Sequence, residues 1–154
     1  FNAPSANYYV ATRHRNHLGV MSASPVDFST GTGTIDFTQT STATYGTHAR
    51  KDLGGGVMAL WAGNVNADQS IRHSSAPSDV TPVANAVLNH AGNTTRSPAY
   101  TGFVSVYSLF DVNLDGNIFY TAAPSDHAII ISNVKTHPGN TFGITSYIIR
   151  EQLP

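Results

Sequence analysis

The sequence predicts an α+β fold, in which a mainly β N-terminal part precedes two duplicated, EF-hand-like loop–helix units. Residues 64–94 recur without a gap at residues 111–141, with 13 of 31 aligned positions identical, where random pairing gives roughly two. Each copy opens with an acidic, Asn-rich loop and continues into an apolar run. We therefore expect a single domain over residues 1–154, divided into a β-rich part (1–56), a first loop–helix unit (57–99) and a second one (100–154).

The N-terminal part is predicted to consist of short strands. Residues 7–13 are rich in aromatic and β-branched side chains, and Leu18–Ala23 resumes the apolar run until Pro25 ends it. We expect a hairpin across residues 7–24. Further along, Thr34–Thr38 alternates polar and apolar side chains, which predicts a half-buried strand.

Breakers and caps define the elements around the repeat. The glycines at 54–56 interrupt the chain, and Val57–Trp61 is expected to form a short strand or a helical turn. A Ser-Asp pair in each copy precedes an apolar run, and such side chains cap the free amides of a first helical turn. The remaining expected elements are helices at Val83–Leu88 and Ala128–Val134, helix C-termini or turns just after them at Gly92 and Gly139, and a closing strand at residues 142–150.

The composition limits the classes of function. Charged residues make up 11% of the chain, far below the usual ~25%, and the net charge of −1 gives no electrostatic case for nucleic acid or an anionic membrane. There is no cysteine, which excludes disulfides and thiol chemistry. No apolar run approaches the ~18–20 residues of a membrane span. The chain opens at Phe1, as a processed or partial chain does. Its low content of charged residues, with many hydroxyl and amide side chains, suits an exported, β-rich or assembling protein.

The second loop has the residue types and spacing of a calcium site. Calcium takes six to eight oxygens from carboxylates, amides, backbone carbonyls and water. Asp111, Asn113, Asp115 and Asn117 occupy alternate positions, and Gly116 stands where an EF-hand loop needs a positive φ. The pattern therefore matches the first eight positions of an EF-hand loop.

The exit of this loop differs from that of an EF-hand. Ala122 stands where the closing Glu is expected, and the next carboxylate is Asp126. Asp79 is its counterpart in the first copy, so these two aspartates are the candidate closing ligands. Ile118 is expected to anchor the loop in the core.

The first loop carries the same pattern with fewer charges. Asn64, Asn66, Asp68 and Asp79 are its candidate ligands, and Gln69 stands where Gly is wanted. A side chain at that position costs ~1–2 kcal/mol if the backbone is left-handed. We expect the second loop to bind calcium more tightly. The alternative, that both loops are Asx-rich turns that need no ion, stays open.

Other clusters give weaker signals. His14 and His17 are three residues apart at a strand end or turn, which favours a structural hydrogen-bond cluster over a transition-metal site. The Gly-x-Ser-x-Gly motif is absent, and Ser neighbours of histidine such as Ser74 lie in the loop region, so a serine hydrolase is not expected. Several aromatic residues are assigned to the core, with a sugar-binding platform as the alternative: Tyr8, Tyr9, Trp61, Tyr100, Tyr107 and Tyr120.

Four stretches carry a resemblance to a known family. They are Tyr9–Met21, Ala59–Asn66, the Asp-x-Asn-x-Asp-Gly…Ser-Asp loop of the second copy, and the ending Arg150–Pro154. Together they resemble the C-terminal region of large secreted surface proteins of Bacteroidetes-type bacteria. Those proteins often carry paired loops of this form, with Asn-Asp at the closing position where this chain has Ser-Asp.

The resemblance covers most of the chain apart from residues 29–55. It implies an exported, non-enzymatic, calcium-stabilised module of adhesin, matrix or filament type. The ligand roles carry over to Asp111, Asn113, Asp115 and Asp126, and to Asn64, Asn66, Asp68 and Asp79. Asn64, Gln69 and the residue before Asp79 depart from the family pattern.

Three functional hypotheses follow. The first is an extracellular, calcium-stabilised structural or adhesive module whose partners are copies of itself, as in a filament or matrix, or cell-surface molecules. The second is a carbohydrate-binding module with structural calcium, and the third, a secreted hydrolase, is disfavoured. Self-association is expected through strand edges in residues 7–13 or 142–150, or through donation of Phe1–Thr12 to a neighbouring sheet.

Overall fold

The computed structural model describes residues 4–103 and 106–154. In this part of the chain, two helices and several small antiparallel sheets make a mixed fold, which confirms the expected combination of elements. The chain divides into two compact units. Unit 1 comprises residues 1–14, 19–61 and 151–154, and unit 2 comprises residues 15–18 and 62–150. Neither helix of the described residues has the length and apolarity needed to cross a bilayer.

Unit 1 is built on short antiparallel pairs of strands. β1 (Asn7–Tyr8) pairs with β4 (Val26–Asp27), and β5 (Arg50–Asp52) pairs with β6 (Met58–Leu60). The short strand expected within Val57–Trp61 is therefore confirmed as β6. β5 was not predicted, because its polar residues do not alternate with apolar ones.

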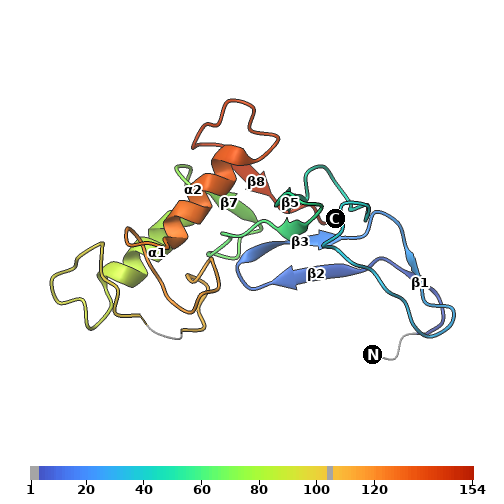
Figure 1. Ribbon diagram of the computed structural model, residues 1–154, viewed down its shortest axis with the longest axis horizontal. Coiled ribbons are helices and arrows are strands. Elements are labelled where there is room, and N and C mark those ends of the chain that lie inside the picture. Colours follow the sequence, from blue (N-terminus) through green and yellow to red (C-terminus); the bar gives the residue numbers. More distant parts are fainter. Residues whose placement is uncertain (1–3, 104–105) are drawn as a thin grey trace. The chain divides into compact units, whose positions relative to one another are not determined.

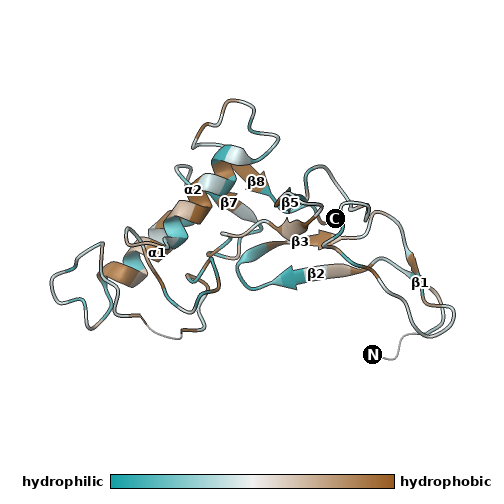
Figure 2. Ribbon diagram, in the orientation of Figure 1, coloured by the Kyte–Doolittle hydropathy of each residue, from teal (hydrophilic) through white to brown (hydrophobic). Residues whose placement is uncertain are grey.

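A hairpin joins β2 (Ala11–His14) to β3 (His17–Met21) through a turn at Arg15 and Asn16, as predicted (Figure 1). Figure 2 shows that β3 is the apolar strand of this pair, whereas β2 is hydrophilic towards the turn. The three central residues of β3 are buried. This buried strand explains why the apolar pattern located the hairpin correctly.

The strand expected at residues 7–13 is interrupted. Val10 lies between β1 and β2, and its amide donates to the Ser22 hydroxyl at 3.1 Å. Its carbonyl accepts from the Ser22 amide at 2.9 Å. Since the amide of Val10 is bonded to a side chain, the run splits, and β1 pairs with β4.

The strand expected at Thr34–Thr38 was a wrong prediction, because this segment is irregular. Asp36 Oδ1 accepts from the amide of Thr38 at 2.8 Å and from its hydroxyl at 2.6 Å, and this side-chain turn bends the backbone. Ile35 and Phe37 are nevertheless half-buried. The alternation of polar and apolar residues therefore indicated which side chains are partly buried, but it did not indicate a strand.

Unit 2 contains both helices. α1 (Val80–Leu88) and α2 (Asp126–Thr136) confirm the two predicted helices, and α2 packs against α1 and against β7 (Ser70–Arg72). β7 pairs antiparallel with β8 (Ile148–Arg150). The closing strand expected at 142–150 is therefore correct only in its last three residues.

The core of unit 2 repeats every 47 residues. Val83 and Val87 of α1 are fully buried, as are Ile130 and Val134 at the equivalent positions of α2. The loops contribute in the same way, and Ile118 is 3% exposed, which confirms its expected anchoring role. The other buried apolar residues are Leu18, Val65, Ile71, Phe103, Val112 and Ile149.

The structural repeat extends beyond the aligned segment. After α1, Asn93 Nδ2 donates to the carbonyl of Val87 at 2.8 Å, and after α2, Asn140 Nδ2 donates to that of Val134 at 2.7 Å. A His ring then lies against a Tyr ring in each copy: His90 with Tyr100 at 5.1 Å and His137 with Tyr147 at 5.3 Å. Gly92 and Gly139 lie in the turns just after the helices, which was one of the two expected placements.

Candidate metal centre in the repeat loops

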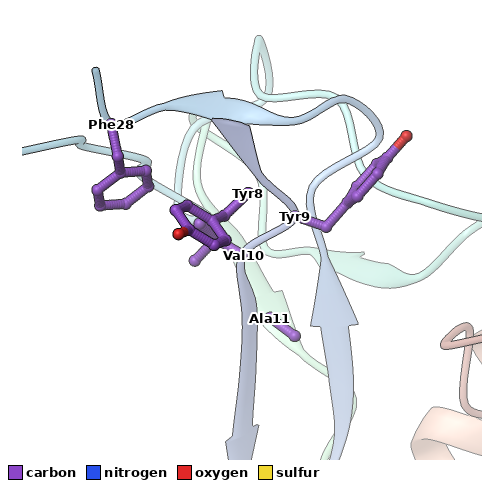
Figure 3. A pocket seen from close by; sticks show the side chains of 5 residues that line it. All are labelled: Tyr8, Tyr9, Val10, Ala11 and Phe28. Atoms are coloured by element: carbon purple, nitrogen blue, oxygen red, sulfur yellow. The ribbon is translucent and has the colours of Figure 1, made fainter. Parts of the chain in front are cut away.

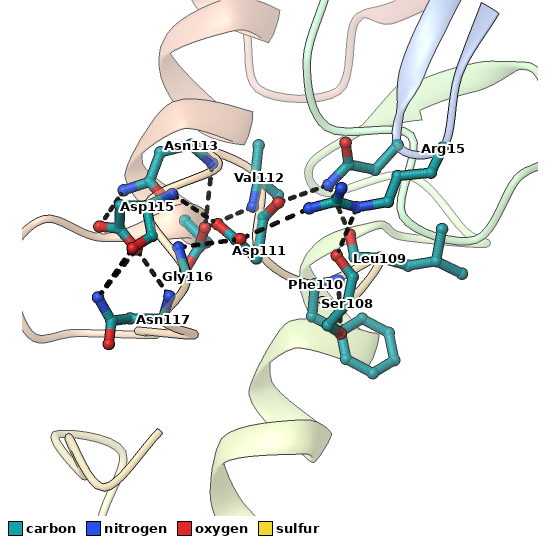
Figure 4. Close-up of polar contacts among 12 residues, drawn as sticks. Arg15, Ser108, Leu109, Phe110, Asp111, Val112, Asn113, Asp115, Gly116 and Asn117 are labelled. Atoms are coloured by element: carbon teal, nitrogen blue, oxygen red, sulfur yellow. Dashed lines mark hydrogen bonds and ion pairs between the residues drawn. The ribbon is translucent and has the colours of Figure 1, made fainter. Parts of the chain in front are cut away.

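The side chains of the second loop converge on its interior (Figure 4). Asp111 Oδ1 and Asn113 Oδ1 both accept from the amide nitrogen of Asp115, each at 3.1 Å. Two oxygens that share one donor lie close together, although they belong to the first and third positions of the loop. The chain thus curls so that the side chains of the first and third positions meet the backbone of the fifth.

Asp115 and its neighbours complete the curl. Asp115 Oδ1 accepts from the amide of Asn117 at 2.8 Å, and Oδ2 accepts from Asn113 Nδ2 at 2.8 Å. Gly116 has φ 82° and donates to Asp111 Oδ2 at 3.1 Å. The positive φ expected at this glycine is therefore present, and it directs the amide back to the opening carboxylate.

Asp126 closes the loop by hydrogen bonds to the backbone. Its Oδ1 accepts from the amides of Val112 and Asn113 at 2.6 and 3.3 Å, and its Oδ2 from the amide of Phe119 at 2.7 Å. The residue is 1% exposed. Burial raises the pKa of the carboxyl to about 6, against the lowering effect of these amides, and the nearby Asp111 raises it further.

The first loop reproduces this geometry with different residues. Asn64 Oδ1 and Asn66 Oδ1 accept from the amide of Asp68 at 3.0 and 3.1 Å. Asp79 is fully buried, and its carboxylate accepts three backbone amides in the same pattern as Asp126. Burial raises its pKa to about 6. Gln69 has φ 65°, so the left-handed backbone expected there is present despite the side chain.

Two arginines lie against the loop carboxylates. In the second loop, Arg15 Nη2 is 3.5 Å from Asp111 Oδ2, and the Arg15 guanidinium carbon lies 4.0 Å from the centre of the Tyr107 ring. In the first loop, Arg72 Nη1 is 3.7 Å from Asp68 Oδ2. Sequence reasoning missed both contacts. Arg72 is four residues after Asp68, a spacing that offered a signal, whereas Arg15 is distant in sequence.

Asn16 forms hydrogen bonds with the backbone at the start of both loops. It is fully buried, and its Nδ2 donates to the carbonyls of Leu109 and Asp111 at 2.9 and 2.6 Å. Its own carbonyl accepts from the amides of Gly63 and Asn64 at 2.9 and 3.0 Å. The turn between β2 and β3 is therefore part of the candidate centre, and no local pattern pointed to it.

The donor set suits a hard cation. Oxygens of Asp111, Asn113 and Asp115 lie within the second loop, where they accept hydrogen bonds from its amides, and carboxylate and amide oxygens are the ligands that calcium prefers. Among the described residues, no three His, Cys, Asp or Glu side chains group as metal ligands. A calcium ion would therefore depend on Asn113, on backbone carbonyls and on water for the remaining oxygens.

The histidines fall into separate places. His17 Nδ1 contacts Asn16 Oδ1 at 2.8 Å, and His14 lies at the end of β2. A different pair meets in unit 2, where His73 Nε2 is 3.1 Å from His127 Nε2. Burial lowers the pKa of both imidazoles, which favours neutral rings that share one hydrogen bond between the loop exit and the start of α2.

An aromatic pocket lies in unit 1 (Figure 3). Its volume is about 330 Å³, and it is lined by Tyr8, Tyr9, Val10, Ala11 and Phe28. The rings of Tyr8 and Phe28 meet edge to face at 5.7 Å, and Tyr9 is 57% exposed. Two aromatic residues proposed as a sugar platform thus gather here, whereas Trp61 is 2% exposed and belongs to the core.

Comparison with known proteins found no match: no family model, no curated protein and no solved structure matches this chain.

Proposed function

We propose that this chain is an extracellular, non-enzymatic structural or adhesive module, whose repeat loops bind calcium to stabilise the fold. Asp111, Asn113 and Asp115 supply side-chain oxygens of the stronger site, with Asn117 at the seventh position and Asp126 adding the closing negative charge. Asn64, Asn66, Asp68 and Asp79 form the weaker site. The proposed fold is thus a pair of EF-hand-like loop–helix units that lack the entering helix.

One observation carries this proposal. The oxygens at the first and third positions of both loops bond to the same amide, that of the fifth position, at 3.0 to 3.1 Å. Simple Asx turns do not require the first position to reach the fifth. The low charge of the chain and its lack of cysteine support an exported module in which ions supply the stabilisation that disulfides give elsewhere.

Calcium removal tests the proposal. An ion bound only by the native state adds about 2.7 kcal/mol at a hundredfold excess over Kd. The melting temperature should therefore fall by several degrees in excess EDTA and recover when calcium is added. Asp115→Ala should abolish most of this shift. An identical melting curve in EDTA and calcium, with no ion found by elemental analysis, would refute the proposal.

A carbohydrate-binding module is the second candidate, favoured by the pocket of Tyr8, Tyr9 and Phe28. Aromatic faces stack on sugar rings, and Tyr9 is accessible. Binding on a glycan array that is lost in Tyr9→Ala, and retained in Tyr107→Ala, would favour this function. Tyr107 is a suitable control because it is 85% exposed and lies outside the pocket.

Self-association is the partner proposal for the structural module. With few charges, copies of the chain have little mutual repulsion. The N-terminal segment proposed to join a neighbour's sheet begins at Phe1, and its first three residues lie outside the described part of the chain. Deleting residues 1–6 should weaken assembly and leave calcium binding unchanged. A full chain that stays monomeric at high concentration with calcium, as judged by light scattering, would contradict it.

A further inference from the structure

Arg72 and Phe119 occupy equivalent positions in the two loops but differ in charge. The backbones match, because each residue donates its amide to the closing aspartate at 2.7 Å. At this position the two repeats therefore share the backbone contact and differ in the side chain. The first loop carries a guanidinium where the second carries an apolar ring.

The Arg72 side chain is held inside the first repeat. Its Nη1 is 3.7 Å from Asp68 Oδ2 and donates to the carbonyl of Ala76 at 3.2 Å. The side chain is 15% exposed, and its buried Nε has no hydrogen-bond partner. A largely buried cation needs a nearby anion, and Asp68, at the fifth position of the loop, is that anion.

The charges of the two loops differ accordingly. The first loop holds Asp68 and Asp79, and Arg72 offsets one of these two carboxylates, which leaves a net charge of −1. The second holds Asp111, Asp115 and Asp126, and Arg15 offsets one of three. The second loop thus keeps two negative charges, the number that a divalent cation neutralises.

The position of the cation differs as well. From the β2–β3 turn, Arg15 approaches Asp111 Oδ2, which also accepts from the amide of Gly116, while Asp111 Oδ1 accepts from the amide of Asp115. Arg72 instead pairs with the fifth-position carboxylate. Asp68 and its equivalent Asp115 both accept from the asparagine at the third position and from the amide of the seventh, and among the described residues only Asp68 has an arginine beside it.

We propose that Arg72 is a built-in cation that weakens calcium binding in the first repeat and supplies its stabilising positive charge, so that this loop folds without an ion while the second depends on one. The inference rests on the proposed calcium function of the second loop. It assigns the two repeats different roles. The first repeat loop is folded with or without calcium, and the folding of the second depends on the calcium concentration.

Reciprocal variants of the full chain test this assignment by calorimetry. The wild type should bind one calcium ion tightly. Arg72→Gln, which keeps a hydrogen-bond donor and removes the charge, should raise the affinity of the first loop by at least about tenfold, because a cation no longer repels the ion. Arg72→Lys is the matched control and should change nothing. Phe119→Arg should lower the affinity of the second loop by at least about tenfold.

Hydrogen exchange supplies a readout that does not depend on bound metal. In EDTA, the amide of Asp68 should stay protected in the wild type, and the equivalent amide of Asp115 should exchange faster. Arg72→Gln should make the Asp68 amide exchange in the same way, and its circular dichroism in calcium verifies that it folds. If Arg72→Gln fails to fold, Arg72→Phe, which copies the second repeat, takes its place.

The outcomes separate this inference from the calcium proposal. A wild type that binds two ions with similar affinity would overturn the role of Arg72 and leave the calcium function standing. Unchanged first-loop affinity and Asp68 protection in Arg72→Gln would overturn it as well. A wild type that binds no calcium would overturn both.

Discussion

The two repeats of unit 2 share one backbone design and differ in the side chains that complete it. Both use a buried aspartate to collect three amides, a serine bonded to the loop exit and an Asn–Tyr–His cluster after the helix. They differ at the opening residue, at the position of Gly116 and at that of Arg72. The backbone hydrogen bonds and the Asn and Asp at the third and fifth positions are therefore shared, and the differences change the charge and the local backbone freedom of each loop.

This distribution shows which features the fold requires. The aspartates Asp79 and Asp126 bond to the backbone of their own loop, so losing either leaves buried amides without an acceptor. The interior residues bond mainly to one another and determine how the loop balances its charge. Substitutions inside a loop can therefore change its affinity for an ion and leave its backbone conformation intact.

The largest expected effect comes from the shared aspartates. Asp126→Ala leaves three buried amides unsatisfied, each worth about 1–3 kcal/mol. We expect a loss of about 3–5 kcal/mol in the free energy of unfolding, measured by urea denaturation. Asp79→Ala should cost a similar amount in EDTA, because its hydrogen bonds are the same. A loss below 1 kcal/mol at one site and not at the other would break the equivalence of the repeats.

The pH dependence in EDTA should have the opposite sign to that of an ordinary salt-bridged carboxylate. The pKa of Asp79 and of Asp126 is raised from 3.8 to about 6, so the folded state holds these protons more tightly than the unfolded chain. That stabilisation is complete below pH 3.8 and is lost as the pH rises through about 6. The free energy of unfolding should fall by about 1 kcal/mol per carboxyl between pH 5 and pH 6.

Calcium should change this profile in the second repeat. A bound cation favours the ionised carboxylate, so the fall near pH 6 should shrink when calcium is present. Asp126→Asn, which cannot ionise, is the control and should remove one carboxyl's share of the slope. A free energy of unfolding that rises steadily from pH 5 to pH 7 in EDTA would contradict the raised pKa values.

A smaller effect is expected at the sixth loop position. Gln69 has φ 65° and Gly116 has φ 82°. Gln69→Gly should therefore stabilise the chain by about 1 kcal/mol, and Gly116→Gln should destabilise it by about 1–2 kcal/mol. Thermal unfolding of both variants measures the two effects. Loss of stability in Gln69→Gly would show that the side chain, and not the backbone, determines the preference at this position.

The repeat was the most predictable part of the molecule. Residues at a constant offset of 47 carry the same hydrogen bonds, so aligning the chain with itself located both loops, both helices and the curl around Asp115. The alternating loop pattern follows from local geometry, in which the Asn and Asp at the third and fifth positions reach an amide two residues ahead and the opening residue reaches one four residues ahead. Such features require no knowledge of distant residues.

The contacts that the sequence did not reveal are long-range or charged. Asn16 bonds to residues more than ninety positions away, and no local pattern selects such a partner. In unit 1, Arg50 donates to the carbonyls of Phe37, Gln39 and Thr42 and organises a loop that alternation had suggested as a strand. Local side-chain turns and a buried cation therefore outweighed strand propensity there.

The smallest difference expected concerns the helix caps. Ser125 lies in an extended conformation and accepts from the amide of Ala128 at 3.2 Å, so α2 begins with a side-chain cap. In α1 the N-cap is Asp79, whose carboxylate is bonded to the loop, and Ser78 accepts only from Val80 at 3.2 Å. Losing the Ser125 hydroxyl therefore leaves the amide of Ala128, the third residue of α2, without its capping acceptor. Losing the Ser78 hydroxyl removes only a hydrogen bond to the amide two residues ahead.

Ser125→Ala should lower the free energy of unfolding by about 1 kcal/mol, which is typical of a lost N-cap. Ser78→Ala should cost about half as much, because the helix already starts without a capping side chain. Chemical denaturation in EDTA compares the two variants without any contribution from bound ions. Ser125→Thr is the matched control, since its hydroxyl can still accept from the amide of Ala128 and donate to the carbonyl of Tyr120. A cost at Ser78 equal to that at Ser125 would show that the two helices start in energetically equivalent ways, despite their different capping residues.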